Sequence, residues 1–292
     1  MTRQVSRPLA ALLRTLLAAL ALAGAGCGGE KPMAVSRVRA RVDVVTFGGA
    51  VGHGRAMPRR RAEWVARKAL GASEVLGRIE VDSPGWIVEV QGLLELDSGR
   101  GRGRGTATVA IESSRFEGPV QAVRSFEGTI AGTADRGPFE KALGRAVDAA
   151  AGLESLRRLP PAGLRDALST EDPERLVVAA RALGSHHRPE DVPAVVGLLR
   201  HTSPAVREAA TGALVVLGDP SAVRALIDTD DTHDPLSTIR ILDAVAALGG
   251  DEATAWVEFV ATGHPLETVR RTAHQARRRM ARSERRAAGK AR

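Results

Sequence analysis

The residues best able to do chemistry in this sequence are one cysteine, seven histidines and a short acidic run. Cys27 is the sole thiol, so it has no partner for an internal disulfide, a redox pair or a zinc site. The densest polar run is DTDDTHD at 228–234, whose aspartates and histidine are residue types that bind divalent cations. We expect this run, like SHHRPED at 185–191, to lie in a turn. Aspartates also cap helices there, so polar capping is favoured over a metal site.

Sequence motifs of common catalytic centres do not occur. The chain has no G-x-S-x-G nucleophile elbow and no HExxH zinc motif. GHGRAMPRRR at 52–61 places glycines beside arginines, but it lacks the lysine followed by serine or threonine that a phosphate-binding P-loop needs. We therefore predict no catalytic residue, no bound metal and no cofactor.

The surroundings of Cys27 indicate what its thiol does. Three arginines and the apolar stretch TLLAALALAG come before it, and no acidic residue occurs before Glu30. A basic start, a short apolar middle and a small-residue exit are typical of an export signal. Because a membrane-spanning helix needs about 20 apolar residues, this stretch is too short to span a bilayer comfortably. We expect residues 1–26 to be removed.

The segment AGAGC resembles the lipobox of bacterial lipoproteins. Ala25, Gly26 and Cys27 match, while Gly24 stands where that family usually has leucine. The resemblance implies cleavage before Cys27 and a triacylated amino terminus, with palmitate among its chains, which anchors a protein without spanning the membrane. Gly28, at a position where inner-membrane retention signals often have aspartate, favours the outer membrane. An ordinary secretory signal and an organelle transit peptide are the alternatives.

The composition of the remaining chain narrows the possible partners. Removal of residues 1–26 leaves 266 residues, enough for two modest domains, and takes three arginines away, so the formal net charge falls from +8 to +5. Aromatic residues make up only 3% of the chain and tyrosine is absent, so few side chains could stack on bases or sugars. This mild charge and the scarcity of aromatic residues argue against nucleic acid as a partner.

Period-two hydrophobicity dominates the amino-terminal half after a linker at 27–34. We expect a strand from residue 35, a helix over 58–70, strands over 85–97, 106–113 and 120–132, and a helix over 138–156. The order of strand, helix, three strands and helix predicts an α+β domain at 35–157, with its helices on one face of the sheet. We interpret GRGRGRG at 99–105 as a flexible hairpin tip rather than an arginine-glycine arm for an anionic polymer.

Helical periodicity and internal similarity mark the carboxy-terminal half. Pro204, Pro235 and Pro265 recur at steps of 31 and 30 residues, a period typical of helix-hairpin solenoids. Four helix pairs can be drawn, and in each of them a proline opens the second helix, where its missing N–H costs little. We expect the repeats to span 158–283 and a basic tail to follow at 284–292.

The segment VREAATGALVVLGDPSAV at 206–223 resembles the HEAT-like repeat, especially the short form named after phycobilisome lyases. That resemblance implies a ladder in which an arginine of each repeat pairs with acidic groups of neighbouring turns. The matching arginines are Arg207, Arg240 and Arg270. The partner aspartate occurs as Asp172 and Asp234, whereas Ser203 and His264 replace it elsewhere, so we expect an incomplete ladder.

These features together favour a scaffold over an enzyme. HEAT-like repeats build curved surfaces that hold other proteins, and no catalytic centre is recognisable. We expect a non-catalytic lipoprotein of the bacterial cell envelope, anchored through Cys27 and binding an envelope protein. A ligand-binding or enzymatic site at the junction of the two domains, and electrostatic binding of an anionic envelope polymer, are the alternatives.

Overall fold

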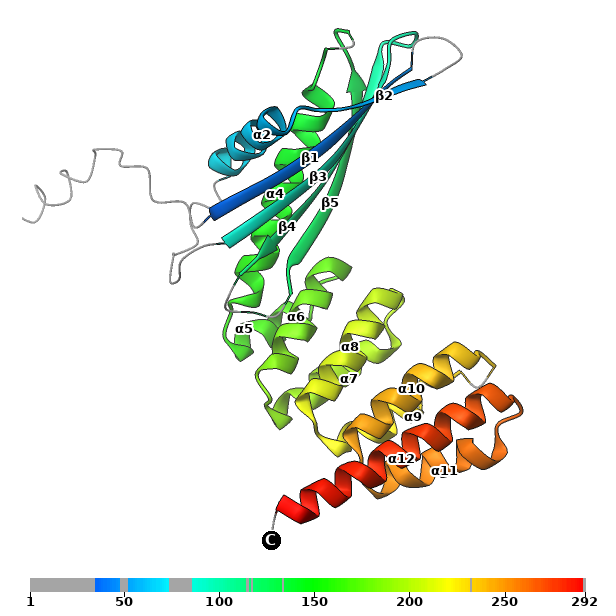
Figure 1. Cartoon of the computed structure of the whole chain (residues 1–292). Helices are drawn as coiled ribbons and strands as arrows, with labels where there is room; N and C mark the ends of the chain where they lie inside the picture. Colours follow the sequence, from blue (N-terminus) through cyan, green and yellow to red (C-terminus); the bar gives the residue numbers. More distant parts are fainter. Residues whose placement is uncertain are drawn as a thin grey trace, which may run out of the picture.

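A sheet-containing part and a helical part follow one another along the chain in the computed structural model (Figure 1). The structure describes residues 35–47, 52–73, 86–113, 116, 118–132, 134–231 and 233–290. The signal segment at 1–26, Cys27, Gly28 and the linker at 27–34 lie outside the described residues. In the part of the chain that is described, no helix combines the length and the apolar character needed to cross a bilayer.

Five strands form one mixed sheet, in the order β2-β1-β3-β4-β5. The strands are β1 (Val35–Phe47), β2 (Gly52–Ala56), β3 (Trp86–Asp97), β4 (Arg102–Glu112) and β5 (Val120–Thr129). β3, β4 and β5 form an antiparallel meander, as the sequence predicts, and β1 pairs with β3 in parallel. The sequence did not predict the edge strand β2, because GHGRA contains as much glycine as a connecting loop. This segment nevertheless pairs antiparallel with the end of β1.

Helices α2 (Arg59–Ala72) and α4 (Gly137–Arg157) cover one face of this sheet (Figure 1). Apart from the added strand β2, the predicted order of strand, helix, three strands and helix is confirmed. An apolar stripe on α4 is buried, and its members are Phe139, Ala142, Leu143, Ala146, Val147, Ala150 and Leu153. These side chains pack on alternate residues of the strands, including Val88, Val90 and Val109, to form one core.

The tract GRGRGRG is not simply a hairpin tip. Only its start belongs to the turn, because β4 begins at Arg102 and pairs through Gly103 and Gly105 with β3. The two glycines are buried on the helix-facing side, whereas Arg104 is exposed on the opposite face. A Cβ on Gly105 would lie 2.4 Å from the backbone of Phe139, so α4 can approach the sheet only because this residue is glycine.

The second half of the chain consists of paired helices, as predicted. The elements are α5 (Pro161–Ala167), α6 (Pro173–Ser185), η1 (Pro189–Asp191), α7 (Val192–Val196), η2 (Gly197–Arg200), α8 (Pro204–Leu217), η3 (Pro220–Ala222), α9 (Val223–Ile227), α10 (Pro235–Leu248), α11 (Asp251–Gly263) and α12 (Glu267–Lys290). Prolines open α6, α8 and α10, but α12 begins two residues after Pro265. Helix α12 also runs to Lys290, so the expected tail at 284–292 is helical over most of its length.

The two parts meet at the end of α4. Leu156 of this helix belongs to the core of the helical part, while Val178 of α6 packs against the core of the sheet part. Arg124 of β5 and Glu174 of α6 form two parallel hydrogen bonds of 2.9 and 2.8 Å across the junction. The hydrogen bond to Glu174 raises the pKa of Arg124 despite its partial burial. Packing and a bidentate ion pair therefore join the two parts.

Candidate interaction surface

Aspartates cap two of the four second helices. Asp172 accepts a hydrogen bond from the N–H of Glu174 at 2.9 Å, and Asp234 accepts one from the N–H of Leu236 at 3.0 Å. Both predicted aspartates therefore act as N-caps, of α6 and α10. An N-cap satisfies a helix N–H that has no partner within the helix, and so fixes where the helix begins.

In the other two pairs a histidine three residues before the second helix makes a similar hydrogen bond. His201 Nδ1 accepts a hydrogen bond from the N–H of Ser203 at 3.0 Å, and His264 Nδ1 accepts one from the N–H of Leu266 at 3.2 Å. An Nδ1 that accepts a hydrogen bond leaves the proton of a neutral imidazole on Nε2. Ser203 holds the N-cap position of α8, where α6 and α10 have Asp172 and Asp234, but its side chain makes no capping hydrogen bond.

Arginines six residues after these two histidines reach back to the turns. Arg207 donates through Nη1 to the carbonyl oxygens of His201 and Thr202, at 2.8 and 2.9 Å. Arg270 donates in the same way to the carbonyl oxygens of His264 and Pro265, at 2.6 and 2.9 Å. In these two repeats the arginine therefore bonds backbone carbonyls of its own turn rather than an acidic side chain of a neighbouring turn.

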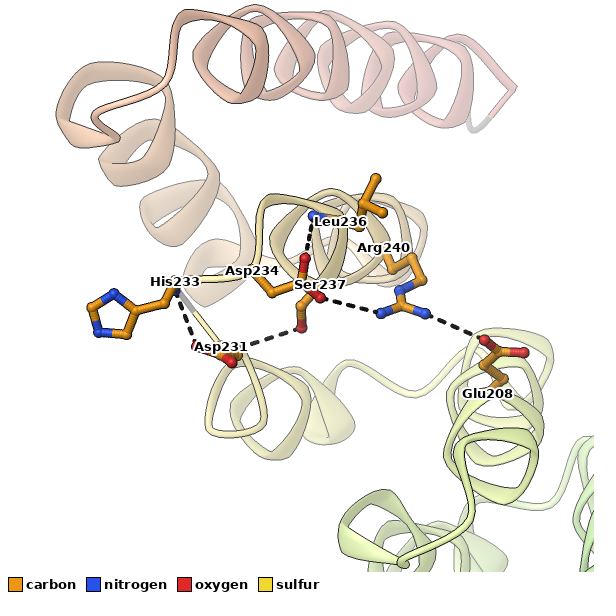
Figure 2. Close-up of polar contacts among 7 residues, drawn as sticks. All are labelled: Glu208, Asp231, His233, Asp234, Leu236, Ser237 and Arg240. Carbon is orange, nitrogen blue, oxygen red and sulfur yellow. Dashed lines mark hydrogen bonds and ion pairs between the residues drawn. The ribbon is translucent and has the colours of Figure 1, made fainter.

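Arg240 makes the acidic contacts that the ladder predicts. Its guanidinium lies 3.8 Å from the carboxylate of Asp234 and 3.3 Å from that of Glu208, which belongs to the preceding helix α8 (Figure 2). Arg240 thus connects its own turn to the neighbouring helix pair. All three side chains are about half exposed, so each contact contributes at most about 1 kcal/mol to stability.

A second ion pair continues along the same helices. Asp243 of α10 lies 2.5 Å from Arg279 of α12. With the pair between Glu208 and Arg240, it links α8, α10 and α12 in succession. These contacts favour one register of the stacked helices. The resemblance to HEAT-like repeats did not point to Glu208, Asp243 or Arg279, because these residues lie outside the motif around each turn.

A groove of about 310 Å³ lies between α8 and α10. Charged side chains of both signs line it, namely Arg207, Glu208, Arg240 and Asp243. Thr211 and Ser237 add hydroxyl groups, and Leu199 and Ile241 add apolar surface. Such a lining can donate and accept hydrogen bonds at several points, which suits a peptide segment better than a purely apolar ligand.

The acidic run at 228–234 forms a turn with internal hydrogen bonds. The carboxylate of Asp231 accepts a hydrogen bond from the N–H of His233 at 3.0 Å, and Asp234 caps α10 (Figure 2). Burial raises the pKa of Asp230, against opposing effects of Thr238 and His264. Among the described residues, no three His, Cys, Asp or Glu side chains are placed to hold a metal ion.

Two exposed leucines lie near the starts of α10 and α12. Leu236 is 68% exposed and Leu266 is 44% exposed. Their backbone N–H groups donate to Asp234 and His264, each two residues earlier, so the two leucines follow equivalent side chains in successive repeats. An exposed apolar side chain on a well-ordered turn is suited to contact with a partner.

A comparison with known protein families supports this repeat architecture. The family of HEAT repeats matches residues 161–248, which run from α5 to the end of α10, so this stretch of the helical part is a HEAT-repeat region. No curated protein matches the sequence. Among solved structures, the chain is similar to the complex of CpcE and CpcF of phycocyanin lyase from Nostoc sp. PCC7120, at 25% identity and a TM-score of 0.38. The similarity covers 47% of this chain and 60% of the solved chain.

Proposed function

We propose that this protein is a lipid-anchored, non-catalytic scaffold of the bacterial cell envelope that holds another envelope protein. The observation that carries the proposal is the HEAT-repeat surface, in which ion pairs link successive helices around a groove of mixed polarity. Stacked helix pairs of this kind build an extended surface whose usual role is protein binding. Neither the sequence nor the groove supplies a nucleophile paired with a general base, which supports a role without catalysis.

The partner should present both charge and apolar surface. The groove between α8 and α10 offers Arg207 and Asp243 as charges of opposite sign. Leu236, next in sequence to the groove residue Ser237, and Leu266, just before α12, offer exposed apolar side chains. Large apolar anchors surrounded by polar groups carry most of the binding free energy in protein interfaces. A segment with one or two apolar side chains flanked by charges of both signs would fit this surface.

The proposed anchor would bring the scaffold and its partner together on one membrane. The lipobox-like residues Ala25, Gly26 and Cys27 support acylation, and Gly28 favours the outer membrane over the inner one. Two molecules confined to one membrane meet at a higher effective concentration than in solution. A modest intrinsic affinity would then suffice.

Intact mass measurement of the detergent-extracted full chain tests the anchor. The wild-type chain should lack residues 1–26 and carry three acyl chains at Cys27. The variant Cys27→Ala should carry none and should leave the membrane fraction. An unmodified wild-type chain in the soluble fraction would refute the tether.

Crosslinking in cells followed by affinity capture tests the scaffold. We expect the wild-type chain to crosslink one envelope protein reproducibly, and Leu236→Ser/Leu266→Ser to lose it. The matched control is Leu93→Ser/Val123→Ser, which removes two exposed apolar side chains from the open face of the sheet. If Leu236→Ser/Leu266→Ser kept the partner and the control lost it, the partner would bind the sheet instead of the helical repeats.

A further inference from the structure

Helix α2 presents a tryptophan to solvent in the middle of its outer face. Trp64 is 49% exposed, whereas the opposite side of the helix is buried against the sheet through Ala62, Val65, Ala66 and Leu70. Residues three and four positions away are the surface neighbours of a helical side chain. For Trp64 all four of these neighbours are exposed cations, namely Arg60, Arg61, Arg67 and Lys68.

Two of these cations lie against the tryptophan ring. The guanidinium of Arg61 is 4.5 Å from the ring centroid and the ammonium of Lys68 is 5.6 Å from it. The acidic residue of the helix, Glu63, is paired with Arg59 at 2.8 Å. Within the described part of the chain, none of the four cations around Trp64 forms an ion pair with a carboxylate. The outer face of α2 therefore places an aromatic ring among four positively charged side chains.

Folding does not require this arrangement. The buried side of α2 already packs on the sheet, and a half-exposed tryptophan adds little to that core. Tryptophan prefers the boundary between water and hydrocarbon, and basic side chains near an anionic membrane are attracted to its phosphate groups. A helix with a buried inner face and this outer face is suited to contact with the surface of such a membrane.

We propose that the outer face of α2 rests on an anionic lipid bilayer, with Trp64 at the level of the headgroups and the four cations against lipid phosphates. This inference builds on the proposed tether. Val35, where β1 begins, is eight residues after Cys27, and an extended segment of that length spans at most about 29 Å. Because α2 packs against β1, an acylated Cys27 would hold this helix within reach of the membrane.

The basic helix α12 is a less suitable surface. It carries more cations than α2, but Arg277 and Arg279 are paired with Glu258 and Asp243, and it has no Trp, Phe or Tyr. Figure 1 shows α12 at the end of the helical part farthest from α2. Its remaining exposed arginines, Arg278 and Arg282 among them, provide a matched control for charge.

Vesicle cosedimentation tests the proposal with the chain that begins at residue 28, which contains every described helix and strand and lacks the acylated cysteine. We expect binding to phosphatidylcholine vesicles containing 30% phosphatidylglycerol, and none to pure phosphatidylcholine. Arg60→Glu/Arg67→Glu should weaken binding by about 30-fold or more, from about fivefold for each basic residue near an anionic surface. Trp64→Ala should weaken it with no change of charge. The control Arg278→Glu/Arg282→Glu should change it by less than about twofold.

Three results would overturn the proposal: equal binding by Arg60→Glu/Arg67→Glu and the unsubstituted chain, loss of binding in the α12 control alone, or binding to soluble polyphosphate but not to vesicles. Circular dichroism spectra would confirm that each variant is folded. The vesicle assay does not depend on acylation, so its failure alongside an acylated Cys27 would reject the α2 contact and retain the tether. If Cys27 were unmodified and the chain still bound the vesicles, the tether would be rejected and the α2 contact retained.

Discussion

The contact between β4 and the start of α4 should be unusually sensitive to one methyl group. A Cβ on Gly105 would lie 2.4 Å from the N and Cα atoms of Phe139 and 2.4 Å from the carbonyl carbon of Pro138. Non-bonded carbon atoms normally approach to about 3.5–4.0 Å. In Gly105→Ala the amino end of α4 would therefore have to move away from the sheet by about 1 Å.

The expected cost follows from what this movement disturbs. Overpacking a core usually costs about 1–3 kcal/mol, and less when a flexible side chain can yield. Here the obstructing atoms are backbone, and Phe139 itself is fully buried. We therefore expect Gly105→Ala to lower the free energy of unfolding by about 3 kcal/mol. The control Gly152→Ala, in α4 with no atom within 4 Å of the new methyl group, should raise it by about 0.5–1 kcal/mol.

Urea denaturation followed by circular dichroism would measure both free energies. The two substitutions add the same methyl group, so they should differ by about 3.5–4 kcal/mol if the close approach is real. A Gly105→Ala chain within about 0.5 kcal/mol of wild type would show that α4 does not press on β4 in this way. Loss of stability in Gly152→Ala would instead show that α4 is not a regular helix at that point.

Three further predictions concern the junction, a cap and pH. A double-mutant cycle of Arg124→Met and Glu174→Gln, measured by urea denaturation, should give a coupling free energy of about 0.5–1 kcal/mol, because the pair is bidentate but about a third exposed. A coupling free energy of zero would contradict an ion pair across the junction. Asp172→Ala should lower the free energy of unfolding by about 1 kcal/mol, and Asp172→Asn by less, because asparagine still caps; equal losses would argue against the cap. Backbone N–H groups lower the pKa of Asp135, so its carboxylate should stabilise the fold at neutral pH and lose this effect as the pH falls through the lowered pKa. Asp135→Asn should thus be less stable than wild type at pH 7 and approach it below about pH 4, and an unchanged difference at low pH would contradict this.

The regular elements could be predicted because burial imposes their periodicity. Val38, Val42 and Val44 alternate with exposed residues in β1, and the stripe from Phe139 to Leu153 follows the helical period in α4. Both patterns exist because one side of each element faces the core. The four helix pairs were also predictable, since Pro204 and Pro235 are the first residues of helices.

Features that depend on a partner in space were missed. β2 contains too many glycines to resemble a strand, and its pairing comes from the strand beside it. Gly103 and Gly105 were interpreted as part of a flexible tip. The sequence alone does not distinguish a glycine that leaves room for a packed helix from one that only allows the chain to turn. The hydrogen bond that His201 accepts from the N–H of Ser203 was also missed, because this imidazole lies two residues before the N-cap position at which the sequence aligns Ser203 with Asp234.

The junction between the two parts bears on how a tethered scaffold would act. The 21 residues of α4 press on the sheet at Phe139 and enter the helical core at Leu156, so this helix belongs to both parts. The pair of Arg124 and Glu174 adds a second connection beside it. A chain held at Cys27 and resting on α2 would therefore have its sheet fixed relative to the membrane, and α4 would carry that orientation to the groove between α8 and α10. The groove would then lie at a defined distance from the membrane and face a defined direction. Fixing both would raise the effective concentration of the groove near a membrane-bound partner more than a flexible linker of the same length would.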